Sequence, residues 1–483
     1  MNRKIGVGVL WNLASAFMTR GASTIFTLLL ARLLAPEAFG LVAMATVVFE
    51  LANVFVSSGL GQALIRSKEV SRADLNTVFY TNLLLSGIAY SVLFGLSPFV
   101  ASFYGQPELT TLVRVMGLVV FLNAAKVVQT AVLSREMDFK TQMKANTLGV
   151  LVSGSLALTL AWLGWGVWSL VAQMLSAAAM SALILWWISE WHPSFQFSCE
   201  SFVRLFRFGR NLLAEGMLSV LYQNSYMLVI GRLFGAETAG LYFFARKVSN
   251  LVSQQLTRAV QQATYPALAR LQDDNFVLRN KYRQILQLMM FLIAPTMALL
   301  AGLASPLFRL LFNEQWQPAI PYLQLLCLVG MLYPLHALNM NLLNVKGRSD
   351  LVLKVGLVKK ALNLTLLFVA IPYGVIGIVI SQVVGAALSL VPNTYFSSKF
   401  LGYGLREQLL DAFKPILAAV GAGLSAFWLA ELFSGSAFTS FVSGGLGGAL
   451  AFLVLALFFR VDAIRLLLDK VGFFQPLRRF FES

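Results

Sequence analysis

The sequence predicts an all-α membrane protein with about 14 transmembrane helices, arranged as two six-helix lobes followed by two C-terminal helices. Three observations predict this fold: an apolar composition, a succession of hydrophobic segments, and a phrase that occurs twice. Of the 483 residues, 58% are hydrophobic and 12% are charged, and soluble chains carry about twice that charged share. The mean hydropathy is +0.74. Because a water-facing surface cannot be built from this mixture, the bilayer is the expected solvent.

Fourteen apolar segments are each long enough to cross the hydrocarbon core as a helix. The predicted spans are 7–34, 38–64, 75–103, 109–133, 142–163, 167–189, 211–234, 238–263, 285–311, 320–345, 351–371, 375–398, 409–432 and 438–459. They predict an N-terminal lobe over 1–190, a cytoplasmic connection over 191–210, a C-terminal lobe over 211–400 and two further spans within 401–460. The tail over 461–483 alternates apolar and basic positions, which predicts an amphipathic helix on the cytoplasmic leaflet.

Lysine and arginine occur in alternate connections between these spans. The intervening connections, which read APE, YGQPE, GWG, GAE, NEQWQP, PYG and FSGSA, contain neither residue. By the positive-inside rule, both termini and the basic connections face the cytoplasm. This placement explains the net charge of +16 and argues against nucleic acid binding, because the basic residues line a membrane face.

The sequence offers little that is typical of an enzyme or a metal protein. Its two cysteines and two histidines have neither zinc-site nor disulfide-framework spacing. A nucleotide-binding glycine loop is also missing, so ATP is not the expected energy source and no cofactor is predicted. Short outer connections leave little room for catalytic loops. An enzyme acting on lipid-linked sugars is therefore a minor alternative, and a non-transporting scaffold is another.

The phrase ARLLAPEAFGLVAMA at 31–45 returns as GRLFGAETAGLYFFA at 231–245. Each copy spans an outer turn, first between spans one and two and then between spans seven and eight. Six helices, an even number, separate the copies, so both face the same way. The pattern predicts a parallel repeat of two lobes around an axis along the membrane normal. Such lobes are typical of transporters that expose a central cavity to each side in turn.

Ionisable side chains occur inside the predicted spans, where each costs about 2.5–3.5 kcal/mol unless it faces water or a partner. The predicted cavity cations are Arg20, Lys126, Arg246, Lys247, Arg258, Lys359 and Lys360. Adjacent residues on a helix point about 100° apart. The two charges of Arg246 and Lys247, or of Lys359 and Lys360, therefore cannot both face lipid without a large cost in free energy. A surplus of cations favours an anionic ligand such as phosphate or pyrophosphate. The arginines near helix ends are expected to extend to the headgroups instead: Arg32, Arg114, Arg232 and Arg309.

Two acids, Glu50 and Glu215, lie in the second and seventh spans. They could pair with the cations, which is the favoured interpretation, or take up H⁺ or Na⁺ as a coupling ion.

Several phrases in order resemble the polysaccharide-transporter family of the MOP superfamily, specifically its Wzx-type exporters, which include the colanic acid exporter. These phrases are LARLLAPEAFG, AVLSREMDF, FGRNLL, YPALARLQDD and NEQWQPAIPYLQLLCLVGM. The resemblance implies a MATE-like fold with helices 1, 2, 7 and 8 around the cavity. It implies a flippase of the bacterial inner membrane that moves an undecaprenyl-pyrophosphate-linked oligosaccharide outward, for exopolysaccharide, O-antigen or capsule assembly. Polysaccharide polymerase and export machinery would be its partners.

Two alternatives within the same superfamily stay open. One is a lipid II flippase, which would also use cavity arginines. The other is a multidrug:cation antiporter, which would have twelve helices and typically an acidic cavity, whereas this chain has a basic excess.

Overall fold

The computed structural model describes residues 18–466 except for 20, 58, 68 and 465. Over this range the protein consists of helices and short connections, without strands. It divides into two compact units, Met1–Phe243 and Phe244–Ser483, each described on its own below. The unit boundary falls inside one long helix, and the predicted lobe boundaries stay a prediction. Nearly all of the predicted amphipathic tail over 461–483 lies outside the described residues.

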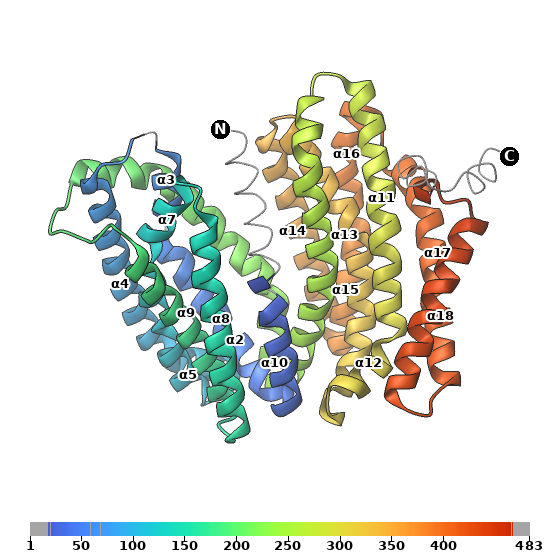
Figure 1. The fold of residues 1–483 in the computed structure, drawn as a ribbon, viewed down its shortest axis with the longest axis horizontal. Coiled ribbons are helices and arrows are strands. Elements are labelled where there is room, and N and C mark those ends of the chain that lie inside the picture. The colour runs from blue at the N-terminus through green and yellow to red at the C-terminus, as the bar shows by residue number, and fades with distance from the viewer. Residues whose placement is uncertain (1–17, 20, 58, 68, 465, 467–483) are drawn as a thin grey trace. The chain divides into compact units, whose positions relative to one another are not determined.

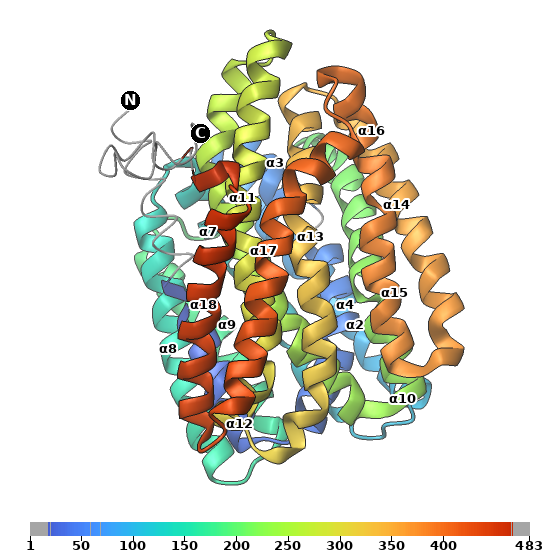
Figure 2. The ribbon, with the colours of Figure 1, turned by 90° about the vertical axis from the view of Figure 1, so that its right-hand side faces the viewer.

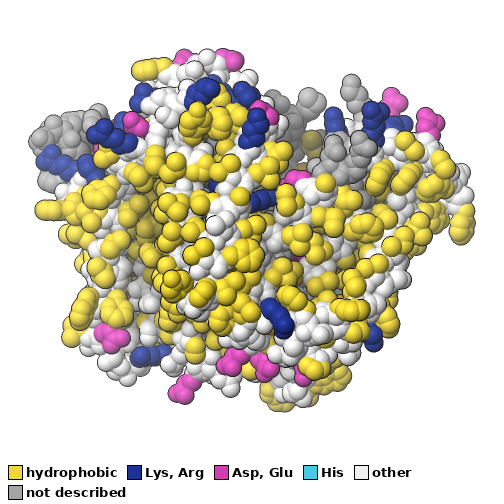
Figure 3. Space-filling view, turned by 180° about the vertical axis from the view of Figure 1, so that it is seen from behind, with side chains coloured by type: hydrophobic (Ala, Val, Ile, Leu, Met, Phe, Trp, Pro, Cys, Tyr) yellow, Lys and Arg dark blue, Asp and Glu magenta, His cyan; other side chains and the backbone are white. Residues whose placement is uncertain are grey.

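Eleven helices in the described range are long and apolar enough to cross a membrane, and a shorter apolar helix, Gly21–Leu33, precedes them. Two of the eleven, Leu213–Arg270 and Ser349–Leu401, are 58 and 53 residues long, enough for two crossings each. In each unit, hydrophobic side chains cover the middle of the visible face, and lysine and arginine gather mainly near one end (Figure 3). The predicted all-α membrane fold is confirmed, and the number of fourteen spans stays a prediction.

The first unit contains the helix Gly21–Leu33 and the following elements (Figure 1). They are α2 (Pro36–Ser57), α3 (Leu60–Arg66), α4 (Arg72–Tyr104), α5 (Leu109–Gly117), α6 (Val119–Ala125), α7 (Val127–Arg135), α8 (Phe139–Trp162), α9 (Val167–Ile188) and the first part of α10 (Cys199–Arg270). Helix α8 packs along α9, and α4 packs against α2 and α5. The connections APE, YGQPE and GWG coincide with breaks between helices, and GAE begins at the non-helical Gly235 inside α10.

One predicted span, 109–133, is broken into the three helices α5, α6 and α7. The breaks lie at Leu118 and at Lys126, where the backbone has φ −104° and ψ 0°. At the second break the Lys126 N–H donates to the carbonyl of Asn123 at 3.3 Å, a three-residue turn in place of the α-helical four. Hydropathy did not reveal this break, because the side chains on both sides of it are equally apolar.

The start of α10 is anchored to the start of α4. Ser71 caps α4 by a reciprocal capping box with Asp74. The same carboxylate, buried, forms an ion pair with Arg204 of α10. Beneath them lies an apolar cluster from α3, α4, α7 and α10 that includes Leu64, Phe79 and Leu205. The ion pair and the apolar cluster together hold the start of α10, and with it the connection from α9, against the start of α4.

The two copies of the repeated phrase meet inside this unit. A Cβ added to Gly40 would lie 1.8 Å from the carbonyl oxygen of Ala236, and one added to Gly240 would lie 1.8 Å from that of Pro36. The contact is reciprocal, as expected when two equivalent turns face each other across a two-fold axis. Gly235 permits the second turn, since its backbone (φ 82°, ψ 178°) is open to glycine and not to other residues. The repeat is therefore a feature of the fold as well as of the sequence.

The second unit contains the rest of α10 and the following elements (Figure 2). They are α11 (Asn275–Gly302), α12 (Ala304–Leu311), η1 (Glu314–Ala319), α13 (Ile320–Val345), α14 (Ser349–Ala370), η2 (Ile371–Tyr373), α15 (Gly374–Leu388), α16 (Leu390–Leu401), α17 (Leu405–Leu432) and α18 (Ala437–Phe458). Helices α11, α17 and α18 run side by side, and α13 packs on α11 and α15.

Two clusters stabilise opposite ends of this unit. At one end Trp316, fully buried, packs against Phe244 and Phe312 with ring centroids 4.6 and 6.0 Å away. At the other end the carboxylate of Asp411 accepts hydrogen bonds from Arg283 at 2.6 and 2.7 Å and from the Tyr403 hydroxyl at 2.6 Å. Burial and the Asp411 carboxylate raise the pKa of Tyr403, so its hydroxyl keeps the donated proton. This second cluster ties α17 to α11.

Candidate functional site

A polar cluster lies among the membrane helices of the first unit. The amide of Asn224, on α10, donates to the carboxylate of Glu50, on α2, at 2.8 Å. The amide of Asn123, on α6, donates to Asn53, also on α2, at 3.1 Å. Glu50 and Asn53 are three residues apart and so share one face of α2. Three helices thus direct carboxylate and amide groups to one place in a region that is otherwise apolar.

Lys126 adjoins this cluster in sequence, three residues after Asn123, and is half-buried at the break between α6 and α7. The break keeps its backbone out of regular helical geometry where a span should be continuous. Polar side chains and irregular backbone inside a membrane are tolerated where they line water or are enclosed by protein. These features make the cluster formed by Glu50, Asn53, Asn123 and Asn224, with Lys126 beside it, the candidate polar site of this unit.

Glu215, the second predicted acid, has a different partner. It is exposed on α10 and accepts a hydrogen bond from the Ser219 hydroxyl at 2.9 Å. Glu50 thus has an amide partner and Glu215 a hydroxyl partner. Their roles in ion pairing or ion coupling stay predictions.

The second unit carries most of the predicted cations. On α10, Arg246 is half-buried and Lys247 is exposed. Arg258, one turn of helix from Gln254, donates to the side-chain oxygen of that residue at 3.1 Å. Arg246 and Lys247 therefore differ in burial as well as in direction, as expected from the 100° rotation between neighbouring residues.

Helix α14 adds Lys359 and Lys360, both half-buried. Asn363 donates to the carbonyl of Lys359 at 2.7 Å and to the hydroxyl of Ser389 at 3.1 Å, so this stretch of α14 is held against the junction of α15 and α16. The Asn363 amide and the Ser389 hydroxyl are in contact, and Lys359 precedes Asn363 by one helical turn on the same side of α14. Such groups suit the oxygens of a phosphate or a sugar.

The predicted residues fall in both units: Glu50, Lys126 and Glu215 in the first, and Arg246, Lys247, Arg258, Lys359 and Lys360 in the second. Arg20 lies outside the described residues. Ion pairs between described residues join Arg204 to Asp74, Arg283 to Asp411 and Arg348 to Asp350. The assignment of these cations to one shared cavity stays a prediction.

Two of the arginines expected near helix ends are held by aromatic rings. The guanidinium of Arg114 lies 4.1 Å from the ring centre of Phe94 and donates to Ser97 at 2.9 Å. That of Arg232 lies 5.6 Å from the ring centre of Phe103. Cation–π contacts of this kind stabilise a charge that is only partly hydrated.

Sequence reasoning overlooked several amides. Asn53, Asn123 and Asn224 escaped notice because only charged residues were considered, although a mid-span asparagine is also costly without a partner. A second amide pair, Asn339 and Gln408, is fully buried in the other unit and hydrogen-bonded at 2.8 Å. A search for every polar residue in the spans would have found them. No group of three or more potential metal ligands occurs within the described part of the chain.

Comparison with characterised proteins gives relatives over most of the chain. It is 28% identical over 475 residues to the succinoglycan biosynthesis transport protein ExoT of Rhizobium meliloti (strain 1021), covering 96% of this chain and 95% of that protein. It is 26% identical over 419 residues to the lipopolysaccharide biosynthesis protein WzxC of Escherichia coli (strain K12), covering 84% of each.

Among solved structures, the lipid II flippase MurJ in an inward closed conformation has a similar fold. The TM-score is 0.75 at 14% identity, covering 94% of this chain and all of that one. A family model described as "Polysaccharide biosynthesis protein" matches residues 29–321, more than half of the chain. These matches confirm the resemblance found in the sequence. The chain therefore belongs to the polysaccharide biosynthesis protein family.

Proposed function

We propose that this protein is a flippase that moves an undecaprenyl-pyrophosphate-linked oligosaccharide repeat unit across the bacterial inner membrane for exopolysaccharide, O-antigen or capsule assembly. The observation that carries the proposal is the polar cluster around Glu50 and Asn224 inside the membrane helices of a chain from this family. A lipid-linked sugar needs such a path, because its head group is polar while its prenyl tail is not.

The head group and the tail make different demands on the protein. The pyrophosphate is anionic, so the half-buried Arg246, Lys359 and Lys360 are its proposed partners. Sugar hydroxyls both donate and accept hydrogen bonds, which suits the amides of Asn53, Asn123 and Asn224. The tail can stay in lipid throughout. Alternating access of two lobes would then expose the head group to each side in turn.

The proposal places both termini in the cytoplasm, since the basic connections share their side. H⁺ or Na⁺ is the proposed coupling ion, with Glu50 as the carboxylate better placed to bind it. Uptake measured in vesicles under an imposed pH or Na⁺ gradient tests this, and gradient-independent transport would contradict it. Polysaccharide polymerase and export machinery are proposed partners at the outer surface.

Transport is favoured over catalysis because the proposed groups lie within membrane helices and not on surface loops. A multidrug:cation antiporter of the same superfamily is disfavoured by the excess of cations over acids in the spans. A lipid II flippase is the nearer alternative, because its substrate also carries a pyrophosphate. The likeness to MurJ concerns the fold alone.

Deleting the gene should stop export of one surface polysaccharide and cause lipid-linked repeat units to accumulate on the cytoplasmic side. The physical reason is that a pyrophosphate-linked sugar crosses a bilayer extremely slowly without a polar path. Extracted lipids analysed by mass spectrometry provide the measurement, and the plasmid-borne gene provides the control. Normal polysaccharide together with increased drug sensitivity would instead support the antiporter.

Substituting Arg246→Ala or Lys360→Ala should each slow export by about tenfold to a hundredfold, since a hydrogen bond to a charged group contributes about 1.5–3 kcal/mol. Export is measured in the deletion strain at matched protein levels. Matched controls are Arg270→Ala on α10 and Lys354→Ala on α14, both of which replace exposed cations. Export unchanged in both test variants would refute the proposed anion-binding role.

A further inference from the structure

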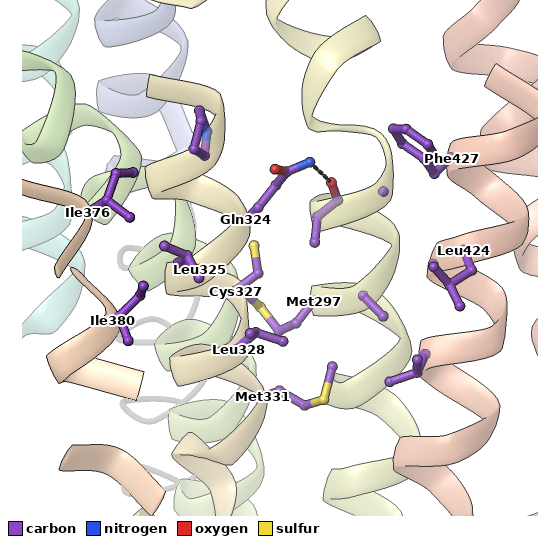
Figure 4. A pocket seen from close by; sticks show the side chains of 16 residues that line it. Met297, Gln324, Leu325, Cys327, Leu328, Met331, Ile376, Ile380, Leu424 and Phe427 are labelled. Carbon is purple, nitrogen blue, oxygen red and sulfur yellow. Dashed lines mark hydrogen bonds between the residues drawn. The ribbon is translucent and has the colours of Figure 1, made fainter. Parts of the chain in front are cut away.

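A large apolar pocket lies in the second unit, and none of the residues proposed to bind the head group lines it. Its volume is about 570 Å³, and residues of α11, α13, α15 and α17 line it. Figure 4 shows Met297, Leu328, Ile380 and Leu424 directed from these helices toward the same space. The volume lies within the range usual for pockets that bind small molecules.

The lining of this pocket is suited to hydrocarbon. Gln324 is its one side-chain amide, and this amide donates to the carbonyl of Ala301 at 3.3 Å (Figure 4). Water in a cavity needs two or more polar partners, so apolar cavities stay dry and bind apolar ligands. Large side chains around it are well exposed, including Leu328 at 42%, Ile380 at 44% and Leu424 at 57%. The pocket thus opens to the surface of the unit, where a bilayer would supply chains.

The depth of the pocket depends on a close approach of α11 and α17. A Cβ added to Gly302 would lie 2.3 Å from the carbonyl oxygen of Gly423, and one added to Gly423 would lie 2.7 Å from that of Ala298. The two helices therefore meet backbone to backbone behind the cavity. Gly302 and Gly423 both line the pocket, so the close packing of α11 and α17 forms part of its wall.

A polar recess adjoins the pocket, and both share Gly302 and Phe427. The recess holds only about 30 Å³ and lies farther toward the ends of α12 and α17. Arg309, Glu431 and Ser436 line it, and the two charged side chains are exposed. Neither of them takes part in the ion pairs found between described residues. A cation and an anion therefore stand beside the mouth of an apolar pocket.

We propose that the pocket and the recess together bind one phosphatidylethanolamine molecule of the surrounding bilayer. One acyl chain fills the pocket between α11, α13, α15 and α17. The lipid phosphate contacts Arg309, and the lipid ammonium contacts Glu431. This charge pair matches a zwitterionic head group, whereas a purely anionic head group would face the repulsion of Glu431. The site is separate from the proposed transport function and does not depend on it.

Native mass spectrometry of the purified, delipidated full-length protein tests the site. Equal amounts of palmitoyl-oleoyl phosphatidylethanolamine and phosphatidylglycerol are titrated in, with undecaprenyl phosphate as competitor. We expect the protein to retain one phosphatidylethanolamine in preference to phosphatidylglycerol. Equal retention of the two, a preference for phosphatidylglycerol, or displacement by an equal concentration of undecaprenyl phosphate would each overturn the proposal, the last by making the lipid carrier the occupant.

Three variants locate the bound lipid. Leu328→Trp fills the pocket and should weaken retention of phosphatidylethanolamine by about tenfold, the loss expected when a couple of methylene groups are excluded. The matched control is Leu292→Trp, at a leucine of similar exposure that does not line the pocket.

Glu431→Gln should lower retention of phosphatidylethanolamine and raise that of phosphatidylglycerol, because the repulsion of the anionic head group is removed, whereas Arg309→Gln should lower both. If Leu328→Trp retains the lipid as the control does, or if Glu431→Gln keeps the preference, the assignment is wrong.

Discussion

Replacing either Gly40 or Gly240 by alanine should abolish export and lower the free energy of unfolding by about 3 kcal/mol, the upper end of overpacking effects. Each new Cβ would lie 1.8 Å from a backbone carbonyl oxygen of the other turn. No side chain can rotate away to relieve this overlap, so the two turns must move apart. Export in the deletion strain and thermal unfolding of the purified protein provide the measurements.

The matched controls are Gly95→Ala on α4 and Gly356→Ala on α14. A Cβ at either glycine meets nothing within 4 Å. Because alanine favours helix by up to about 1 kcal/mol over glycine, both controls should be as stable as the parent or slightly more so. Stability and export in Gly40→Ala that match those of Gly95→Ala would show that the reciprocal contact is not part of the folded protein.

Substituting Asp411→Ala should lower the free energy of unfolding by about 3 kcal/mol, because several buried groups lose their acceptor at once. The Asp411 side chain is 7% exposed and accepts from Arg283, Tyr403 and Gln287. Arg283 is 52% exposed and can be rehydrated, so most of the loss comes from the buried tyrosine and glutamine. Thermal unfolding in detergent is the measurement.

Asp350→Ala is the matched control, because it also removes an aspartate paired with arginine. Asp350 and Arg348 are 49% and 48% exposed, and exposed pairs contribute about 0–1 kcal/mol. We expect Asp350→Ala to lower the free energy of unfolding only slightly and Asp411→Ala to lower it strongly. Equal effects at the two positions would show that burial of the Asp411 cluster adds nothing to stability.

Membrane insertion could be predicted well from the sequence, because it depends on segment length and apolarity, which are local properties. The breaks inside the predicted spans could not. Lys126 is an example: it ends α6, yet neither it nor any residue from Asn123 to Val128 is a helix breaker by type. Such breaks are imposed by neighbouring helices, and the sequence of one span does not record what packs against it.

Within the candidate polar site, residue type pointed only to the charged members, Glu50 and Lys126, and to none of the contacts. Charge alone pointed to Glu50, Lys359 and Lys360 as costly in a bilayer, and all three are half-buried. The hydrogen bond between Glu50 and Asn224 joins residues 174 positions apart, a pairing that helical spacing cannot give. Because only charged residues were considered, the asparagines were not predicted, although their amides make up most of the polar cluster.

The reciprocal turn contact bears on the ancestry of the chain. If the halves arose by duplication, most positions could drift apart, since each adapted to its own surroundings. At Gly40 and Gly240 the surroundings of one copy are the backbone of the other, so a side chain gained in either copy harms both. This mutual constraint explains why the two halves have similar sequences at this turn, whereas elsewhere their sequences have diverged.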